Sequence, residues 1–158
     1  MEDYLPILRS LHHQGVNFAA IGTWALKGYF PEKLQHYVLQ DCDIVLAPEE
    51  GNIRVAISVL NVNGWATTVW DESVDAGTPS LEFVGKYYVR AKQKDLVLDL
   101  TYECLLDWQE IQASRQMLMG LPFASLAHIA LLKRTKGRAN DIELLHILGL
   151  GEYGGLGC

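Results

Sequence analysis

The sequence predicts an α/β (α+β) domain with a small, twisted, mixed β-sheet and helices mainly on one face of that sheet. Segments with apolar residues at helical spacing alternate along the chain with short runs of alternating or β-branched residues, which are typical of strands. The length of 158 residues suits one hydrophobic core. We therefore expect a single domain over residues 1–148, followed by a flexible, glycine-rich tail over residues 149–158.

The composition, 49% hydrophobic and 20% charged, is typical of a soluble globular protein. The net charge of −6 argues against a broad nucleic-acid-binding surface, but a small nucleotide needs only a local positive patch. The longest uncharged run, residues 116–132, is interrupted by Gly120 and Pro122, so we expect no contact with a membrane. The three cysteines have no metal-ligand spacing and no secretory signal precedes the domain, which indicates a cytoplasmic protein.

In the first half of the chain, apolar spacing and turn residues define three helices and three strands. Gly15 stops the first helix, Pro31 ends the second, and Asn63 with Gly64 closes the third. The predicted segments are a helix over 4–14, a strand over 16–21, a helix over 24–29, a strand over 40–47, a helix from Pro48 to Asn63, and a strand over 65–70.

The second half begins with a polar loop over residues 71–79. Two alternating segments, 81–91 and 96–101, predict a hairpin whose turn lies at residues 92–95. A short helix over 106–114 and an edge strand over 116–119 follow. Ser125 predicts the N-cap of a helix that Gly137 closes, and a final helix covers residues 140–148.

Two carboxylates one residue apart, Asp41 and Asp43, open the predicted strand over residues 40–47. Alternate side chains of a strand share a face, so the two carboxylates point together and repel each other. Asp99 lies in the middle of another predicted strand, on the face opposite its leucines. If these strands are neighbours, three carboxylates converge and require a cation to stay ionised. Oxygen ligands of this kind suit Mg²⁺ or Mn²⁺.

Each of these carboxylates also has a simpler interpretation. Asp-x-Asp pairs are common in turns and on protein surfaces, and Asp99 alone could be a strand residue bonded to a nearby loop. A metal site is indicated by the set, because each Asp is followed or surrounded by apolar strand residues.

Gly22 and Thr23 stand between a predicted strand and a predicted helix. A helix N-terminus has free N–H groups and a positive dipole end, so this turn could bind a phosphate, with the Thr23 hydroxyl as a further donor. In the simpler interpretation Gly22 makes a tight turn and Thr23 caps the helix. Likewise, Lys133 and Arg138 could reach a triphosphate, or they could be the solvated cations that a helix C-terminus favours.

The order of these pieces resembles the nucleotidyltransferase superfamily with the polymerase-β-like fold. The motifs that carry the resemblance are a strand ending at Gly22-Thr23, the Asp41-Cys42-Asp43 triplet on the next strand, and Asp99 on a later one. The stretch over residues 121–133 and the residues after it resemble small bacterial members, including the type IV antitoxin-toxin branch. That part of the resemblance includes Lys133, Gly137, Arg138 and Asp141.

The resemblance implies a two-metal transfer of NMP from a nucleoside triphosphate to a hydroxyl group. Asp41, Asp43 and Asp99 would be the catalytic and metal-binding residues, with Mg²⁺ or Mn²⁺ as the ion. Gly22, Thr23, Lys133 and Arg138 would hold the nucleotide. The acceptor would be a small molecule, an RNA or a protein, and a homodimer or a cognate partner protein would complete its binding.

The sequence also departs from the superfamily pattern. Many relatives carry an Arg and a Thr or Ser just ahead of the first Asp, whereas residues 37–40 here are Tyr, Val, Leu and Gln. This departure favours an alternative function, in which the chain is a catalytically inert antitoxin or partner-binding module with the same fold.

Overall fold

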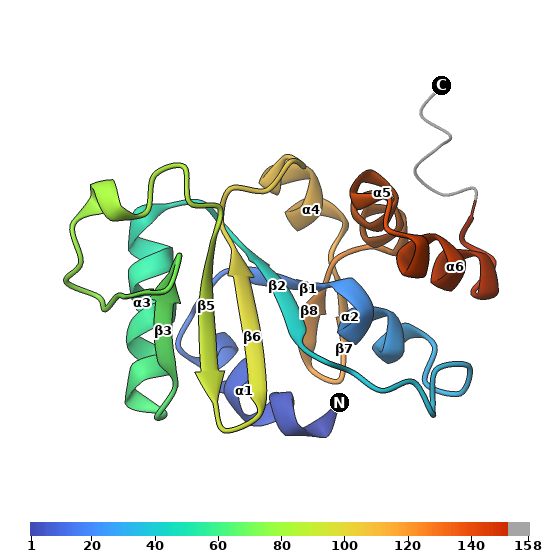
Figure 1. Ribbon diagram of the computed structural model, residues 1–158, viewed down its shortest axis with the longest axis horizontal. Helices are drawn as coiled ribbons and strands as arrows, with labels where there is room; N and C mark the ends of the chain where they lie inside the picture. Colours follow the sequence, from blue (N-terminus) through green and yellow to red (C-terminus); the bar gives the residue numbers. More distant parts are fainter. Residues whose placement is uncertain (152–158) are drawn as a thin grey trace.

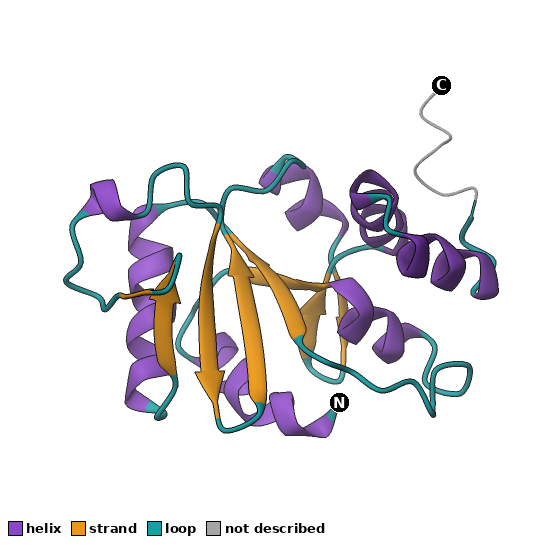
Figure 2. Cartoon of the chain, in the orientation of Figure 1, coloured by secondary structure: helices purple, strands orange, loops and turns teal. Residues whose placement is uncertain are grey.

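The computed structural model of the chain describes residues 1–151. Within this part of the chain, six α-helices and an eight-stranded mixed sheet form an α/β fold (Figures 1 and 2). This architecture confirms the predicted fold class. In the same residues, no helix combines the length and the apolar character that crossing a bilayer demands.

The helices and strands follow one another in an irregular alternation along the chain. The α-helices are α1 (Leu5–His13), α2 (Gly22–Tyr29), α3 (Glu50–Val62), α4 (Trp108–Ser114), α5 (Leu126–Lys136) and α6 (Ala139–Ile147). Short 3₁₀ helices cover Glu2–Tyr4 and Ser80–Glu82. The strands are β1 (Phe18–Ile21), β2 (Cys42–Leu46), β3 (Ala66–Val69), β4 (Glu72–Ser73), β5 (Tyr88–Gln93), β6 (Leu96–Thr101), β7 (Gln116–Leu118) and β8 (Leu121–Phe123).

The sheet has the strand order β4-β3-β5-β6-β2-β1-β8-β7. β2 is parallel to β6, and β1 is parallel to β8. The other neighbouring strands are antiparallel. β2 therefore pairs with β1 on one side and with β6 on the other. It carries Asp43, the second carboxylate of the Asp-x-Asp triplet.

The two faces of the sheet differ in polarity. On β5, Val89 and Ala91 are fully buried, whereas Arg90 is half-buried and Lys92 is exposed. Leu98 on the neighbouring β6 is also fully buried. In Figure 1, α1 and α3 lie behind the sheet, where they contact each other. The hydrophobic core thus lies between the sheet and these helices, and the charged side chains of β5 are on the other face.

α2 begins directly at the end of β1, α5 packs on α2, and α6 packs on α5. The Trp24 ring of α2 stacks on Phe123 of β8, with ring centroids 5.4 Å apart. The Tyr29 hydroxyl donates a hydrogen bond of 2.7 Å to the Ala124 carbonyl. Gly28 permits this close packing, because a Cβ there would lie 2.6 Å from the Phe123 ring.

The predicted hairpin joins the right two strands, but its first strand starts too early, and its turn, predicted at residues 92–95, consists only of Lys94 and Asp95. β5 begins at Tyr88 rather than at residue 81. Residues 80–82 form a 3₁₀ helix, and Gly85 and Tyr87 have positive φ angles of 75° and 72°, which an extended strand does not allow. Alternation of residue types over residues 81–87 therefore did not reflect a strand.

Two further strands were not predicted. The polar loop over residues 71–79 contains the two-residue β4. The predicted edge strand, β7, has a hairpin partner in β8, which includes Pro122. Proline lacks the N–H that a central strand needs, so its presence argued against a strand at this position. Other element ends differ from the predicted ones by a few residues.

The capping prediction for α5 is confirmed. The Ser125 hydroxyl accepts a hydrogen bond from the backbone N–H of His128, and Gly137 ends the helix with a left-handed φ of 65°. The predicted flexible tail over residues 149–158 falls mostly on residues 152–158, which lie outside the described residues.

Candidate functional site

Three carboxylates meet on the polar face of the sheet. Asp43 lies directly opposite Asp99 in the parallel pairing of β2 with β6, so their side chains leave the same face. Asp41 stands two positions before Asp43, directly ahead of the first residue of β2. One ligand oxygen from each residue can be chosen so that the three oxygens lie within 4.8 Å of one another. The structure thus brings together the three carboxylates that the sequence singled out.

Asp43 has an unusual titration because of this arrangement. Burial, together with the nearby charges of Asp41 and Asp99, raises the pKa of Asp43 to about 6. The cations Lys136 and Lys133 act in the opposite direction and lower it. Because the negative charges of Asp41 and Asp99 disfavour ionisation of Asp43, a cation bound among the three carboxylates would be stabilised.

Arg90 is a fourth charged member of the site, which the sequence analysis missed. Its Nε and Nη2 donate to the two oxygens of Asp99 over 2.8 and 3.0 Å. This forked pair raises the pKa of Arg90 through the hydrogen bonds to Asp99. The turn predicted at residues 92–95 would place Tyr88 opposite Asp99, whereas the observed turn pairs Gln93 with Leu96 and therefore Arg90 with Asp99.

Gly22 is the first residue of α2 and lies against Asp43. It adopts a positive φ of 70°, and a Cβ at this position would stand 2.7 Å from Asp43 Oδ2. Both the backbone conformation and the close approach therefore require glycine. The N-terminus of α2, with its free N–H groups, consequently lies beside the carboxylate cluster.

Thr23 does not cap α2 with its side chain, as the simpler interpretation supposed. Its hydroxyl instead accepts a hydrogen bond of 2.9 Å from Lys133 Nζ, which reaches it from α5. Lys133 is 4% exposed, so it is not a solvated cation at a helix end. Thr23 and Lys133 therefore form one polar contact between α2 and α5.

Asp141 of α6 binds the two cations that the sequence assigned to the nucleotide. Lys133 Nζ lies 2.9 Å from Asp141 Oδ1, and Arg138 Nε lies 2.7 Å from Oδ2. Burial opposes ionisation of Asp141, but the hydrogen bonds from Lys133 and Arg138 outweigh it, so its pKa is below its usual value. The Arg138 side chain remains 65% exposed, whereas that of Lys133 is only 5% exposed.

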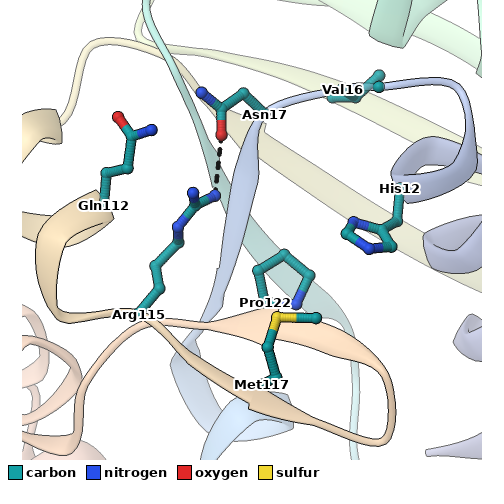
Figure 3. Close-up of a pocket in the computed structure, with 8 residues that line it drawn as sticks. His12, Val16, Asn17, Gln112, Arg115, Met117 and Pro122 are labelled. Atoms are coloured by element: carbon teal, nitrogen blue, oxygen red, sulfur yellow. Dashed lines mark hydrogen bonds between the residues drawn. The ribbon is translucent and has the colours of Figure 1, made fainter.

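A cavity of about 460 Å³ lies elsewhere in the molecule, between the end of α1, the start of β1 and the β7–β8 hairpin (Figure 3). In it, Arg115 Nη1 donates a 2.8 Å hydrogen bond to Asn17 Oδ1. Asn17 precedes β1, while Ile21 at the far end of β1 pairs with Asp43. The cavity and the carboxylate cluster are therefore at opposite ends of β1.

No protein-family model matches the sequence, and no curated protein matches it. Several solved structures do match this chain. A crystal structure of ANT(2'')-Ia in complex with adenylyl-2''-tobramycin matches with a TM-score of 0.54 and 15% identity, over 92% of this chain and 83% of that one. A solution structure of ANT(2'')-Ia, an antibiotic-resistance factor, matches with a TM-score of 0.52 and 16% identity, over 95% and 90% of the two chains.

Two Helicobacter pylori crystal structures, one of them of JHP933, match with TM-scores of 0.49 and identities of 17% and 21%. Each match covers 92% of this chain, but this chain spans 66% and 64% of their lengths. The likeness of ANT(2'')-Ia to this chain confirms the fold expected from the sequence, the nucleotidyltransferase fold.

Proposed function

We propose that this chain, which has the nucleotidyltransferase fold, is an enzyme that transfers a nucleoside monophosphate from a nucleoside triphosphate to a hydroxyl acceptor. The observation that carries the proposal is the convergence of Asp41, Asp43 and Asp99, whose ligand oxygens lie within 4.8 Å of one another beside the N-terminus of α2. Carboxylates next to a helix N-terminus provide sites for a cation and for a phosphate at the same place.

The donor set fits a divalent ion. Three carboxylates with the pKa of Asp43 raised to about 6 form an all-oxygen site whose charges repel, which suits Mg²⁺ or Mn²⁺. Asp41, Asp43 and Asp99 would hold the ions of a two-metal reaction. When bound, such ions neutralise charge on the triphosphate and on the leaving group.

The residues of the chain then have separate tasks. The carboxylate of Asp99 accepts the proton of the acceptor hydroxyl as that oxygen bonds to the α-phosphorus. The bond from the α-phosphorus to the bridging oxygen breaks, and pyrophosphate leaves with the electron pair. The N–H groups at Gly22 and Thr23 receive the departing phosphates. Positioning by these groups provides much of the rate enhancement.

Lys133 and Arg138, the two cations near α2, have different proposed roles in nucleotide binding. Lys133 donates a hydrogen bond to Thr23 and is buried, so we propose that it stabilises the N-terminus of α2, where the phosphates bind, from the interior of the protein. Arg138 is mostly exposed and is held by Asp141 alone among the described residues, so we propose that it contacts the triphosphate directly.

A second candidate function is a catalytically inert partner-binding module, such as the antitoxin of a bacterial toxin-antitoxin pair. The pairing of Lys133 and Arg138 with Asp141 favours it, because it compensates part of the positive charge that a triphosphate would attract. In this case, Arg90 would serve as a permanent counter-ion of Asp99. The enzyme would act on a small molecule, an RNA or a protein as acceptor, whereas the inert module would bind one cognate protein.

Calorimetric titration with ATP, GTP, CTP and UTP in the presence of Mg²⁺ separates the two candidates. We expect metal-dependent binding of at least one nucleotide by the wild type, and loss of that binding in Asp41→Asn/Asp43→Asn. Asp95→Asn is the matched control, since Asp95 is exposed in the β5–β6 turn. The absence of binding by a folded wild-type protein would reject the transferase proposal and favour the inert module.

A further inference from the structure

The cavity near the start of β1 lies at the other end of that strand from the carboxylate cluster. Its volume of about 460 Å³ is in the range of small-molecule sites, roughly 300–1,000 Å³. The polar side chains that line it belong to His12, Asn17, Gln112 and Arg115. Among the residues that the structure describes, no carboxylate lines this cavity. The only permanent charge of this lining is therefore the positive charge of Arg115.

The guanidinium of Arg115 is held in a fixed orientation by three contacts. Its Nη1 donates to Asn17 Oδ1 over 2.8 Å and to the Phe18 carbonyl over 3.0 Å. Its Cζ lies over the Trp108 ring, 5.4 Å from the centroid. Asn17 is itself fixed, since its N–H and its carbonyl both bond to the side chain of Asn52, over 2.8 and 2.9 Å. The guanidinium is thus pre-organised for a ligand.

The other two nitrogens of Arg115, Nε and Nη2, are available to a ligand. Neither has an acceptor within the part of the chain that the structure describes, and neither is a buried atom. In Figure 3, the Arg115 side chain extends toward Asn17, and the Gln112 side chain extends in the same direction. The corresponding edge of Arg90 binds both oxygens of Asp99 in this protein. The free edge of Arg115 therefore matches a carboxylate in geometry.

The charge of Arg115 also lacks a counter-ion. Arg54, Arg90 and Arg138 each pair with a carboxylate 2.7 or 2.8 Å away. Arg115 forms no such pair within residues 1–151, and burial lowers its pKa, which means that its surroundings disfavour the charged form. A partly buried charge is stabilised by a partner of opposite sign, so an anion bound in the cavity would offset this cost.

From these contacts we propose that the cavity binds a small organic carboxylate. The two oxygens of the ligand accept hydrogen bonds from Nε and Nη2 of Arg115, and the Gln112 amide is a further donor. The apolar body of the ligand packs against Val16, Met117 and Pro122, which also line the cavity. A single permanent positive charge favours a monoanion over a phosphate dianion. The proposal is independent of the proposed transfer, because it involves neither the carboxylate cluster nor a nucleotide.

Heteronuclear NMR titrations of the full chain, without metal or nucleotide, test the proposal. The probes are sodium acetate, hexanoate and benzoate, the neutral analogue benzamide, and inorganic phosphate. Benzoate and hexanoate should shift the backbone amides of Gln112, Arg115 and Met117 saturably, with a Kd of about 1 mM. Acetate should bind at least about threefold more weakly, because it lacks the larger apolar body. Benzamide and phosphate should bind at least about tenfold more weakly than benzoate.

Variants separate a ligand site from a structural role of Arg115. Arg115→Gln should weaken benzoate binding at least about tenfold, because it removes the charge and the fork. Arg115→Lys keeps the charge without the fork and should have an intermediate affinity. Arg9→Gln is the matched control, since Arg9 is exposed on α1, and it should bind benzoate as the wild type does. Met117→Ser should weaken the binding of hexanoate but not that of acetate.

Four results would overturn the proposal: no saturable shift with any carboxylate, benzamide binding as tightly as benzoate, shifts confined to the start of α2, or full benzoate affinity in folded Arg115→Gln. Phosphate binding more tightly than benzoate would overturn the assignment to a carboxylate. Thermal unfolding checks that each variant is folded. The comparison of probes on the wild type needs no variant, so it decides the matter even if Arg115→Gln does not fold.

Discussion

Lys133 and Asp141 form an ion pair between α5 and α6 in which the two side chains are only 5% and 8% exposed. Lys133 also donates to Thr23 at the start of α2, so one ammonium group connects three helices. Removing one partner of a buried pair leaves the other charge without compensation, which is strongly destabilising. This contact therefore affects stability as well as the proposed phosphate site.

We expect Lys133→Ala to lower the free energy of unfolding by about 3 kcal/mol, toward the lower end of the range for buried pairs, because Arg138 still compensates Asp141. Urea unfolding followed by circular dichroism measures this. The double variant Lys133→Met/Asp141→Leu removes both charges and should be more stable than Lys133→Ala. If the two variants were equally stable, the buried charge would not be the cause.

Gly22→Ala should destabilise the protein by more than about 1 kcal/mol and weaken metal binding. The fold holds this position at a positive φ, which alanine disfavours, and the added methyl group would displace Asp43. Gly15→Ala is the matched control, since Gly15 has a φ of 81° but open space around its Cβ position. The control measures the backbone cost alone. An equal loss of stability and unchanged Mn²⁺ affinity in the two variants would contradict a clash with Asp43.

The stability of the metal-free protein should fall as the pH rises from about 4 to about 6. The pKa of Asp43 is about 6 in the folded protein, above the value of about 3.9 typical of an unfolded chain, so the folded state binds the proton more tightly. The contribution from protonated Asp43, on the order of 3 kcal/mol, is complete below the unfolded pKa and lost above the folded one. Thermal unfolding in EDTA measures it across this range.

Asp43→Asn provides the control for this pH dependence. Asparagine does not titrate, so the fall in stability between about pH 4 and 6 should become smaller in the variant. Mg²⁺ should also counter the loss in the wild type, since it stabilises the ionised carboxylate. An unchanged pH profile in Asp43→Asn would assign the titration to another group.

Asp99→Asn should reduce the rate of transfer by roughly 10²–10⁴-fold, the usual effect of losing a general base, while nucleotide binding is largely retained. In contrast, Asp41→Asn/Asp43→Asn should abolish metal-dependent nucleotide binding itself. Single-turnover release of pyrophosphate, compared with calorimetric binding, separates the two effects. Full activity of Asp99→Asn would contradict its assignment as the base.

The strand faces on which the three carboxylates lie could be predicted because they depend on local rules. Strand alternation alone places Asp41 and Asp43 on one face, and Asp99 on the face opposite its leucines. The convergence of all three also requires that the two strands be neighbours, and the pairing of β2 with β6 in the structure meets this condition. The Arg90–Asp99 pair was not within reach, since the turn predicted at residues 92–95 would place Tyr88 opposite Asp99, whereas the observed register places Arg90 there.

The environment of Lys133 could not be predicted in the same way. Its burial depends on how α5 packs on α2 and α6, which no local pattern specifies. The helix-end cluster of basic residues suggested solvent exposure, and tertiary packing overrode it. β8 was missed for a related reason: Pro122 argues against a strand locally, but here the strand is held by pairing with β1 and β7.

The parallel pairing of β1 with β8 joins Ala20 to Phe123, whereas β1, β2 and β6 are complete by residue 101. During synthesis, the strands that carry the three carboxylates are thus available before the residues that hold the other flank of α2. Contacts of large sequence separation slow folding, because loop closure must precede them. The strands of the acidic half of the site therefore lie entirely within the first 101 residues, whereas Lys133 reaches Thr23 only because α5, from the last third of the chain, packs on α2.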